Sequence, residues 1–139
     1  MFCIGYSKKF PGTLGSLFSF IFIWFFYSGT FLNFSIFVLF AFLTIFICDR
    51  AEKIFHKKDD QRIVLDEFVG SFVSLLFVPK SIYFYILGFI LFRFFDIKKP
   101  WFIQKSKKFK GGLGVVLDDV LAGVMTSVIL FVLVLLFHK

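Results

Sequence analysis

The stretch FVGSFVSLLFVPKSIYFYILGFILF, residues 68–92, is apolar except near its middle, where Pro79 and Lys80 interrupt it. As one helix it would cross a bilayer once, because about 20 apolar residues are enough to span a hydrocarbon core of about 30 Å. As two helices, each piece would hold only about 12–16 residues and measure about 18–24 Å, which is short of that core. The number of membrane crossings therefore depends on this interruption.

The rest of the chain indicates an integral membrane protein with a single membrane-embedded domain over residues 1–139. Hydrophobic residues make up 59% of the chain, whereas soluble domains contain roughly 45–50%. The first uncharged run has 39 residues, enough for an antiparallel pair of transmembrane helices at about 13–27 and 31–48, with a tight turn around Gly29. Another uncharged run, of 18 residues, lies within a last helix predicted at about 113–138.

The positions of the charged residues favour two helices within residues 68–92. Basic residues crowd the flanking segments, 49–67 and 93–110, and a single crossing would place these segments on opposite faces of the membrane. A hairpin instead brings 14 of the 16 basic residues to one face and leaves Lys80 and Lys139 opposite, as the positive-inside rule expects of a cytoplasmic face. All nine acidic residues fall on the same face, whose net charge of about +5 should attract an anionic lipid membrane.

We therefore expect an all-α integral membrane protein with about five membrane-embedded helices. They form two antiparallel hairpins, the second short or partly re-entrant, and a C-terminal transmembrane helix. In this fold the acidic residues gather at helix ends on the cytoplasmic face, close to the level of the lipid headgroups.

Two acidic pairs stand near predicted helix starts. In VLDEFVG, Asp66 and Glu67 could simply cap a helix and complement its dipole. In GGLGVVLDDVLAG, Asp118 and Asp119 lie just inside the final apolar helix, where a carboxylate is costly and usually faces a protein interior, a polar cavity or a partner. Adjacent helical side chains point about 100° apart, so one of this pair could bind a metal while the other engages a second layer of contacts.

Small residues accompany these acids. In PGTLGS, residues 11–16, the glycines leave backbone N–H groups exposed at a helix start, which can hold a phosphate, and Thr13 or Ser16 could cap the helix. A plain helix start explains this segment equally well. Ala122 and Gly123, just after the second acidic pair, would let another helix approach closely.

In FRFFDIKKPW, residues 92–101, charged side chains interrupt an aromatic run. Arg93 and Asp96 are three residues apart and therefore neighbours on one flank of a helix, and Lys99 follows three residues later. Lysines and a tryptophan in such a stretch are typical of an interfacial anchor. An anchor explains an aspartate flanked by apolar residues less well.

Together these segments predict a membrane face rich in carboxylates and basic side chains. The chain has two Cys and two His residues, all isolated from one another, so no disulfide framework, zinc site or His-dependent reaction is indicated. Carboxylate oxygens suit Mg²⁺, which proteins often bind through one or two carboxylates together with a substrate phosphate. Metal-assisted phosphoryl chemistry on a lipid headgroup follows as a hypothesis.

Four motifs, GTLGS, DDQRIVLDEFVG, FRFFDIKKPW and GGLGVVLDDVLAG, occur in the order and approximate spacing of the bacterial phosphatidylglycerophosphatase A family. This resemblance spans about residues 11–124. It implies an enzyme, a phosphoric monoester hydrolase that converts phosphatidylglycerophosphate to phosphatidylglycerol in phospholipid biosynthesis, with Mg²⁺ as cofactor. It also implies a multi-pass protein of the bacterial inner membrane whose active face is cytoplasmic. We expect no nucleic-acid partner, and the sequence leaves the oligomeric state open.

The resemblance also implies roles for individual residues. Five acids become the catalytic and metal-binding candidates: Asp66, Glu67, Asp96, Asp118 and Asp119. Weaker metal candidates are Asp49 and Asp60. The phosphate-binding candidates are Arg93 and Lys99, with Thr13 and Ser16 as secondary contacts. The attacking group stays open between a Mg²⁺-activated water and a carboxylate such as Asp66. Phe102 departs from the proline that the family leads us to expect, which affects only the local loop.

The sequence lacks the motifs of the other enzyme classes that act on similar lipids. The DG-x2-AR…G-x3-D-x3-D pattern of CDP-alcohol phosphotransferases is absent, as are the DxDx[TV] nucleophile motif and the two catalytic histidines of another lipid phosphatase class. The non-enzymatic alternative is a small multi-helix cation transporter or channel with an acidic lining. That alternative predicts acids facing one another near the bilayer midplane, whereas here they gather at one face.

Overall fold

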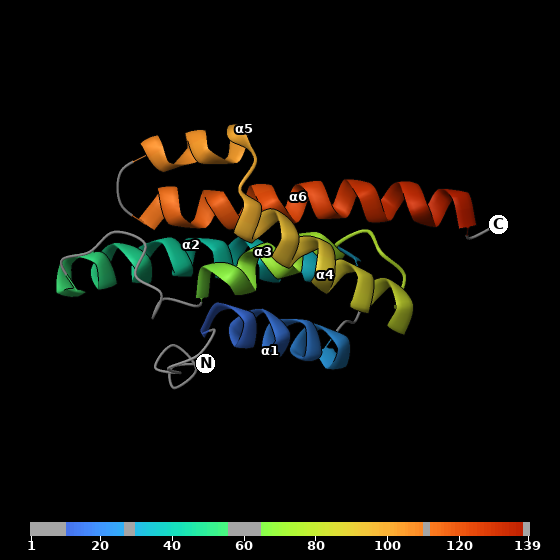
Figure 1. The fold of residues 1–139 in the computed structure, drawn as a ribbon. Helices are drawn as coiled ribbons and strands as arrows, with labels where there is room; N and C mark the ends of the chain where they lie inside the picture. The colour runs from blue at the N-terminus through green and yellow to red at the C-terminus, as the bar shows by residue number, and fades with distance from the viewer. Residues whose placement is uncertain (1–10, 27–29, 56–64, 110–111, 138–139) are drawn as a thin grey trace.

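In a computed structural model, the chain folds into a bundle of helices (Figure 1). The structure describes residues 11–26, 30–55, 65–109 and 112–137. Those residues form no strand, and their helices are α1 (Pro11–Phe26), α2 (Thr30–Phe55), α3 (Leu65–Leu75), α4 (Ile82–Lys98), α5 (Trp101–Gln104), the 3-10 helix η2 (Lys105–Lys108) and α6 (Gly112–Phe137). The predicted all-α fold is confirmed. Asp60 lies outside the described residues.

The helices extend further into the charged segments than the sequence predicts. α2 continues to Phe55 instead of ending at residue 48, and most of the predicted charged stretch 93–110 is helical. The reason is that residues such as Arg50 and Lys53 favour helices and are exposed here. The change from apolar to charged residues therefore marks the end of the apolar surface of a helix. It does not mark the end of the helix itself.

Pro100 does end a helix. The residue before it, Lys99, adopts a left-handed backbone with φ 41°, and its N–H donates to the carbonyl oxygen of Phe95. This closes the last turn of α4 and releases the chain into α5.

The interruption at Pro79 separates two helices, as the charge pattern predicts. α3 ends at Leu75, a turn follows, and α4 begins after Ser81. α4 then runs back beside α3 in the opposite direction (Figure 1). The prediction that α3 and α4 form an antiparallel pair is confirmed.

Two of the described helices are long and apolar enough to cross a membrane. They are α2, over Phe34–Ala51, and α6, over Leu113–Phe137, and α1 is a shorter apolar helix. α3 has 11 residues and measures about 16 Å, so it is too short to span a bilayer. The expectation of about five membrane-embedded helices thus finds support by length and composition only for α2 and α6.

The predicted pairing of the first two helices is wrong in one respect. α1 and α2 run in opposite directions, but their described residues do not contact each other, because α3 lies between them. The Phe68 ring of α3 packs against Phe22 of α1 and Phe40 of α2, with centroid distances of 5.7 and 5.3 Å. α3 also contacts α4 and α6, so the shortest of the main helices is the centre of the bundle.

α3 and α6 approach each other through glycines. A Cβ atom on Gly70 would lie 2.5 Å from the carbonyl oxygen of Asp119, and one on Gly123 would lie 2.3 Å from the carbonyl oxygen of Gly70. Ala122 beside them is fully buried. The predicted role of Ala122 and Gly123 in close helix approach is confirmed, and the partner helix is α3.

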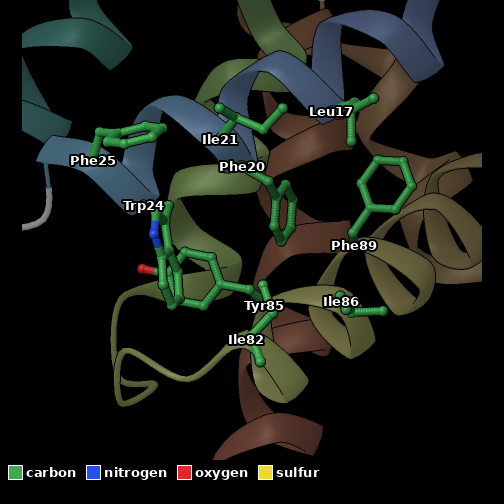
Figure 2. A pocket seen from close by; sticks show the side chains of 9 residues that line it. All are labelled: Leu17, Phe20, Ile21, Trp24, Phe25, Ile82, Tyr85, Ile86 and Phe89. Carbon is green, nitrogen blue, oxygen red and sulfur yellow. The ribbon is translucent and has the colours of Figure 1, made fainter.

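α1 and α4 pack through aromatic rings. Phe20 and Phe89 meet edge to face with centroids 5.6 Å apart, as do Trp24 and Tyr85 at 4.9 Å. Beside these contacts an apolar groove of about 320 Å³ stays open between the two helices (Figure 2).

The alternating directions of the helices bring their charged ends together. The starts of α1, α3 and α6 and the ends of α2 and α4 all lie on the left in Figure 1. At the other end, Lys80 places its Nζ 5.3 Å from the centroid of the Trp24 ring. The predicted gathering of acidic residues at one end is therefore confirmed for those that the structure describes.

The glycine crossing gives the first prediction. Gly123→Val should lower the stability of the purified protein by about 1–3 kcal/mol, because its side chain would collide with the backbone of α3. Thermal unfolding in detergent measures the loss. Val124→Leu, at an exposed neighbouring position of α6, is the control and should unfold at the temperature of the unmodified protein. Equal unfolding temperatures for Gly123→Val and the control would contradict the crossing.

Candidate active site

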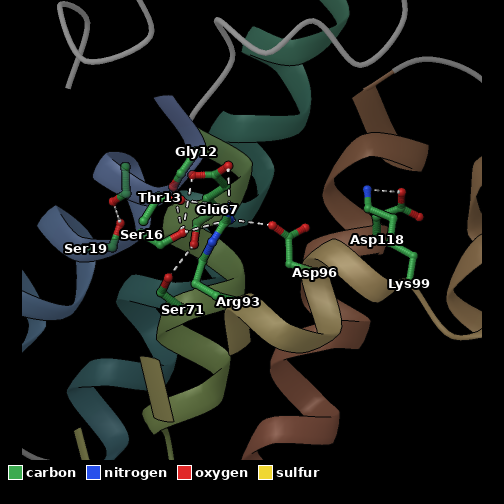
Figure 3. Close-up of polar contacts among 11 residues, drawn as sticks. Gly12, Thr13, Ser16, Ser19, Glu67, Ser71, Arg93, Asp96, Lys99 and Asp118 are labelled. Atoms are coloured by element: carbon green, nitrogen blue, oxygen red, sulfur yellow. Dashed lines mark hydrogen bonds and ion pairs between the residues drawn. The ribbon is translucent and has the colours of Figure 1, made fainter. Parts of the chain in front are cut away.

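Arg93, near the end of α4, is the centre of the polar contacts at the charged end of the bundle (Figure 3). Its Nη1 donates to Asp96 Oδ2 and lies 3.7 Å from Glu67 Oε1. The same nitrogen lies 3.4 Å from Ser16 Oγ, and Nη2 lies 3.3 Å from Thr13 Oγ1. One guanidinium therefore joins α1, α3 and α4, which its rigid fork of five donors permits.

Four carboxyl groups from three helices act on one another: Asp66, Glu67, Asp96 and Asp119. We call them the acidic group. Two of them, Glu67 and Asp96, contact the guanidinium of Arg93. The charges of the other three act on Asp119, which is only 3% exposed. Its Oδ2 is buried and has no hydrogen-bond partner among the described residues. When several such groups are ionised in a poorly solvated place, they leave an excess of negative charge that a cation would relieve.

Burial and the neighbouring charges shift the pKa of Glu67, a member of the acidic group on α3. Burial raises its pKa to about 9, and the neighbouring charge of Asp66 acts in the same direction. Arg93 lowers this pKa, but it does so from 3.7 Å and is itself held by Asp96. A divalent cation beside Glu67 would favour the ionised form, because metal ligands bind as carboxylates.

Asp118 and Lys99 form a separate ion pair beside the acidic group. Lys99 Nζ donates to Asp118 Oδ2 at 3.1 Å, and the carboxyl group is only 4% exposed. Figure 3 shows this pair apart from the contacts of Arg93. Asp118 and Asp119 thus diverge as adjacent helical residues do, one toward Lys99 and the other toward the acidic group.

The first turn of α1 closes the other side of the site. A Cβ atom on Gly12 would lie 2.3 Å from Glu67 Oε1 and 3.5 Å from Arg93 Nη1. Ser16 Oγ donates to the carbonyl oxygen of Gly12 at 2.9 Å and lies 3.4 Å from Glu67 Oε2. The helix start that the sequence offered as a phosphate loop is therefore also the wall against which Glu67 rests.

The structure unites most of the predicted site residues. Thr13, Ser16 and Arg93 lie together with the acidic group, while Lys99 and Asp118 sit beside it. Asp49 is on α2, outside the acidic group as defined, and Asp60 is not described. Sequence reasoning did not assign Gly12 or Gly70 to the site. Both glycines stand in the quoted motifs, but the groups that they admit come from distant segments of the chain.

The donor set suits Mg²⁺ in one particular manner. Among the described residues, no three acidic, His or Cys side chains converge closely enough to enclose a metal ion. Mg²⁺ rarely needs such a cage, because it usually keeps several waters and binds one or two carboxylates together with substrate phosphate. The buried, unpartnered Oδ2 of Asp119 among other carboxyl groups fits that kind of site.

Comparison with known proteins places this geometry in a family. The model of the family described as phosphatidylglycerophosphatase A matches residues 1–134. The chain belongs to the phosphatidylglycerophosphatase A family. It is 35% identical to phosphatidylglycerophosphatase A of Escherichia coli K12, covering 91% of this chain and 76% of that protein. It is 36% identical to the Haemophilus influenzae protein of the same name, covering 87% and 77%.

A further relative carries a different name. A Bacteroides thetaiotaomicron protein, provisionally named a phosphatidylinositol-3-phosphatase, is 39% identical over 92% of this chain and 86% of its own length. No solved structure matches the chain. These matches confirm the family resemblance and the assignment of the chain to a family of enzymes.

Arg93 gives the second prediction. Arg93→Lys should lower phosphatase activity at least about 100-fold, because a lysine cannot hold Asp96, Glu67 and the α1 hydroxyls at the same time. Phosphate release by the purified protein measures this loss. Arg50→Lys, at an exposed position on α2 at the same end of the bundle, is the matched control. Retained activity in Arg93→Lys would show that a point charge is sufficient there.

The pKa of Glu67 gives the third prediction. In EDTA the protein should lose thermal stability as the pH rises from about 4.5 toward 9, because the raised pKa of Glu67 means that its folded state favours the protonated carboxyl. The stability that protonated Glu67 contributes is fully present at pH values below the pKa of the unfolded state. It is lost as the pH rises toward the pKa of the folded state. Glu67→Gln should show a shallower decline of unfolding temperature with pH. An unchanged slope in this variant would contradict the assignment.

Proposed function

We propose that the chain is a Mg²⁺-dependent lipid phosphatase that hydrolyses phosphatidylglycerophosphate to phosphatidylglycerol and phosphate in bacterial phospholipid biosynthesis. The observation that carries this proposal is the contact of Arg93 with Glu67 and Asp96, two members of the acidic group, in a chain of the phosphatidylglycerophosphatase A family. The names of the Escherichia coli and Haemophilus influenzae relatives supply the substrate.

Charge balance supports the need for a divalent cation. Among the described residues, five carboxyl groups lie near two basic side chains, Arg93 and Lys99, so the site would carry an excess of about three negative charges if every group were ionised. A phosphate monoester brings roughly two more at neutral pH. Groups of the same sign repel each other strongly in a poorly solvated place, so a cation that accompanies the substrate would favour its approach.

In this proposal, different residues of the site bind the phosphate and the metal ion. Arg93, with Thr13 and Ser16, is placed to bind the oxygens of the terminal phosphate. Asp66, Asp96 and Asp119 are the candidates to hold Mg²⁺, which when bound polarises the phosphoryl group and neutralises its developing charge. Lys99 holds Asp118 beside them through its ion pair. Hydrolysis adds water to phosphorus and breaks the ester bond, and the released glycerol oxygen takes up a proton.

The identity of the attacking group stays open between a water molecule and a carboxylate such as Asp66. Both fit the buried position of Asp66 at the start of α3. Displacement at phosphorus proceeds in line, so the attacking atom has to lie opposite the ester oxygen. That atom is a carboxylate oxygen in one case, and in the other it is the oxygen of a water molecule that a neighbouring carboxyl group holds.

The membrane setting belongs to this proposal. We infer a multi-pass protein of the bacterial inner membrane, with about five embedded helices and the acidic end of the bundle at the cytoplasmic face. The two long apolar helices and the collection of charges at one end support it. The rival reading, a cation transporter or channel with an acidic lining, predicts acids facing one another near the bilayer midplane, whereas the described acids lie at one end of the bundle.

The fourth prediction tests this function. The purified protein in detergent should release inorganic phosphate from phosphatidylglycerophosphate with Mg²⁺ and none with EDTA. Asp66→Asn, Asp96→Asn and Asp118→Asn should each reduce the rate at least about 100-fold, because each removes a charge that holds the cation or Lys99. Lys105→Gln, an exposed change at the same end, should keep the rate.

Two outcomes would overturn separate parts of the proposal. Full activity in all three aspartate variants would refute the site. Faster hydrolysis of phosphatidylinositol 3-phosphate, the substrate named for the Bacteroides relative, would refute the substrate and leave the lipid phosphatase chemistry standing.

A further inference from the structure

The groove between α1 and α4 begins where the polar site ends. Leu17 follows Ser16 directly and lies one helical turn from Thr13, on the same side of α1. Phe89 lies one turn before Arg93 on the same side of α4. Because Arg93 contacts both Thr13 and Ser16, the two helices carry one continuous track that changes from polar to apolar within a turn.

The walls of the groove are almost wholly apolar. Leu17 and Phe89 lie at its polar end, Phe20 and Ile86 along it, and Trp24 meets Tyr85 further from the polar site (Figure 2). From Leu17 to Trp24 the helix rises about 10 Å. The groove therefore follows α1 for about two turns away from the polar site.

The geometry points to a binding site for an acyl chain of the lipid substrate in this groove, with its phosphate held at Arg93. The inference rests on the proposed function, because the identity of the occupant follows from a lipid phosphate bound at the adjoining polar site. A chain attached to that lipid must leave the site along an apolar surface, and this groove adjoins Arg93, Thr13 and Ser16.

A second apolar groove does not share this relation. It measures about 390 Å³ and lies between α3 and α6, where Val73 and Val124 are the lining residues nearest the acidic end. The backbone crossing at Gly70 and Gly123 separates it from the acidic group. It is larger than the first groove, so size alone would select the wrong one.

The groove would act by positioning. A lipid chain gains little hydrophobic free energy on moving from bilayer to groove, because both surroundings are apolar. What the groove supplies is a fixed direction for the chain, and this fixes the distance between the glycerol backbone and Arg93. Small misplacements of a reacting group can cost roughly 100-fold in rate, so orientation of the lipid is sufficient reason for such a groove.

The fifth prediction uses two neighbouring isoleucines of α4. Ile86 lines the groove and is 54% exposed, whereas Ile90, one turn further on, is 57% exposed and does not line it. Ile86→Trp should lower kcat/KM for long-chain phosphatidylglycerophosphate roughly tenfold or more. Ile90→Trp should leave it unchanged, and both variants should hydrolyse the deacylated substrate at the rate of the unmodified protein. Equal effects of the two substitutions on the long-chain substrate would overturn the inference.

A binding measurement separates this inference from the proposed function. The chain has two tryptophans, so Trp101→Phe leaves Trp24, which lines the groove, as the single tryptophan. A phosphonate analogue of the substrate with brominated chains, which cannot be hydrolysed, should quench Trp24 more strongly than brominated phosphatidylcholine at the same mole fraction in detergent.

Arg93→Ala should abolish the difference between the two brominated lipids, because the headgroup then no longer directs the chain. Equal quenching by both lipids in the unmodified site would overturn the groove, even if hydrolysis is found. Selective quenching together with an absence of hydrolysis would uphold the groove and refute the proposed function.

Discussion

The backbone contact between α3 and α6 is the constraint on which the rest of the structure depends. At this crossing the carbonyl oxygens of Gly70 and Asp119 occupy the space that side chains would fill elsewhere. Asp119 belongs to α6 and Asp66 and Glu67 belong to α3, so the close crossing brings their carboxyl groups near enough to act on one another. Since α3 also contacts α1, α2 and α4, its position constrains where these helices lie.

The same crossing forces an unfavourable collection of charges. Buried carboxyl groups that repel one another destabilise a fold, because they lose hydration without gaining partners. Arg93 offsets part of this cost by binding Asp96 and approaching Glu67, and Lys99 offsets another part at Asp118. The remaining excess of negative charge has no structural purpose that we can identify. Buried charged groups that destabilise the fold and are only partly neutralised by their neighbours are typical of a functional site that binds a ligand.

Sequence reasoning was most successful where a single physical rule decided the outcome. The hairpin of α3 and α4 followed from the uneven distribution of basic residues, and the meeting of the acids at one end followed from the hairpin. It failed where neighbours distant in sequence decide. The insertion of α3 between α1 and α2 depends on how Phe68 fits two helices at once. The contact of Gly12 with Glu67 depends on the approach of α1 and α3, and the two residues are 55 positions apart in the chain. No local sequence pattern predicts the insertion of α3 or the contact of Gly12 with Glu67.

The dimensions of the bundle suggest why a lipid phosphatase would be built in this manner. Thr13 and Arg93 hold the polar end of α1 and α4, and the apolar groove continues from there for about 10 Å. One leaflet of a bilayer contributes about half of a 30 Å hydrocarbon core. A groove of this length therefore accommodates a chain within a single leaflet when the acidic end lies at the headgroups of that leaflet. With the lipid bound as proposed, it need not be lifted out of the membrane or turned across it, because its phosphate would lie at Arg93 beside the acidic group.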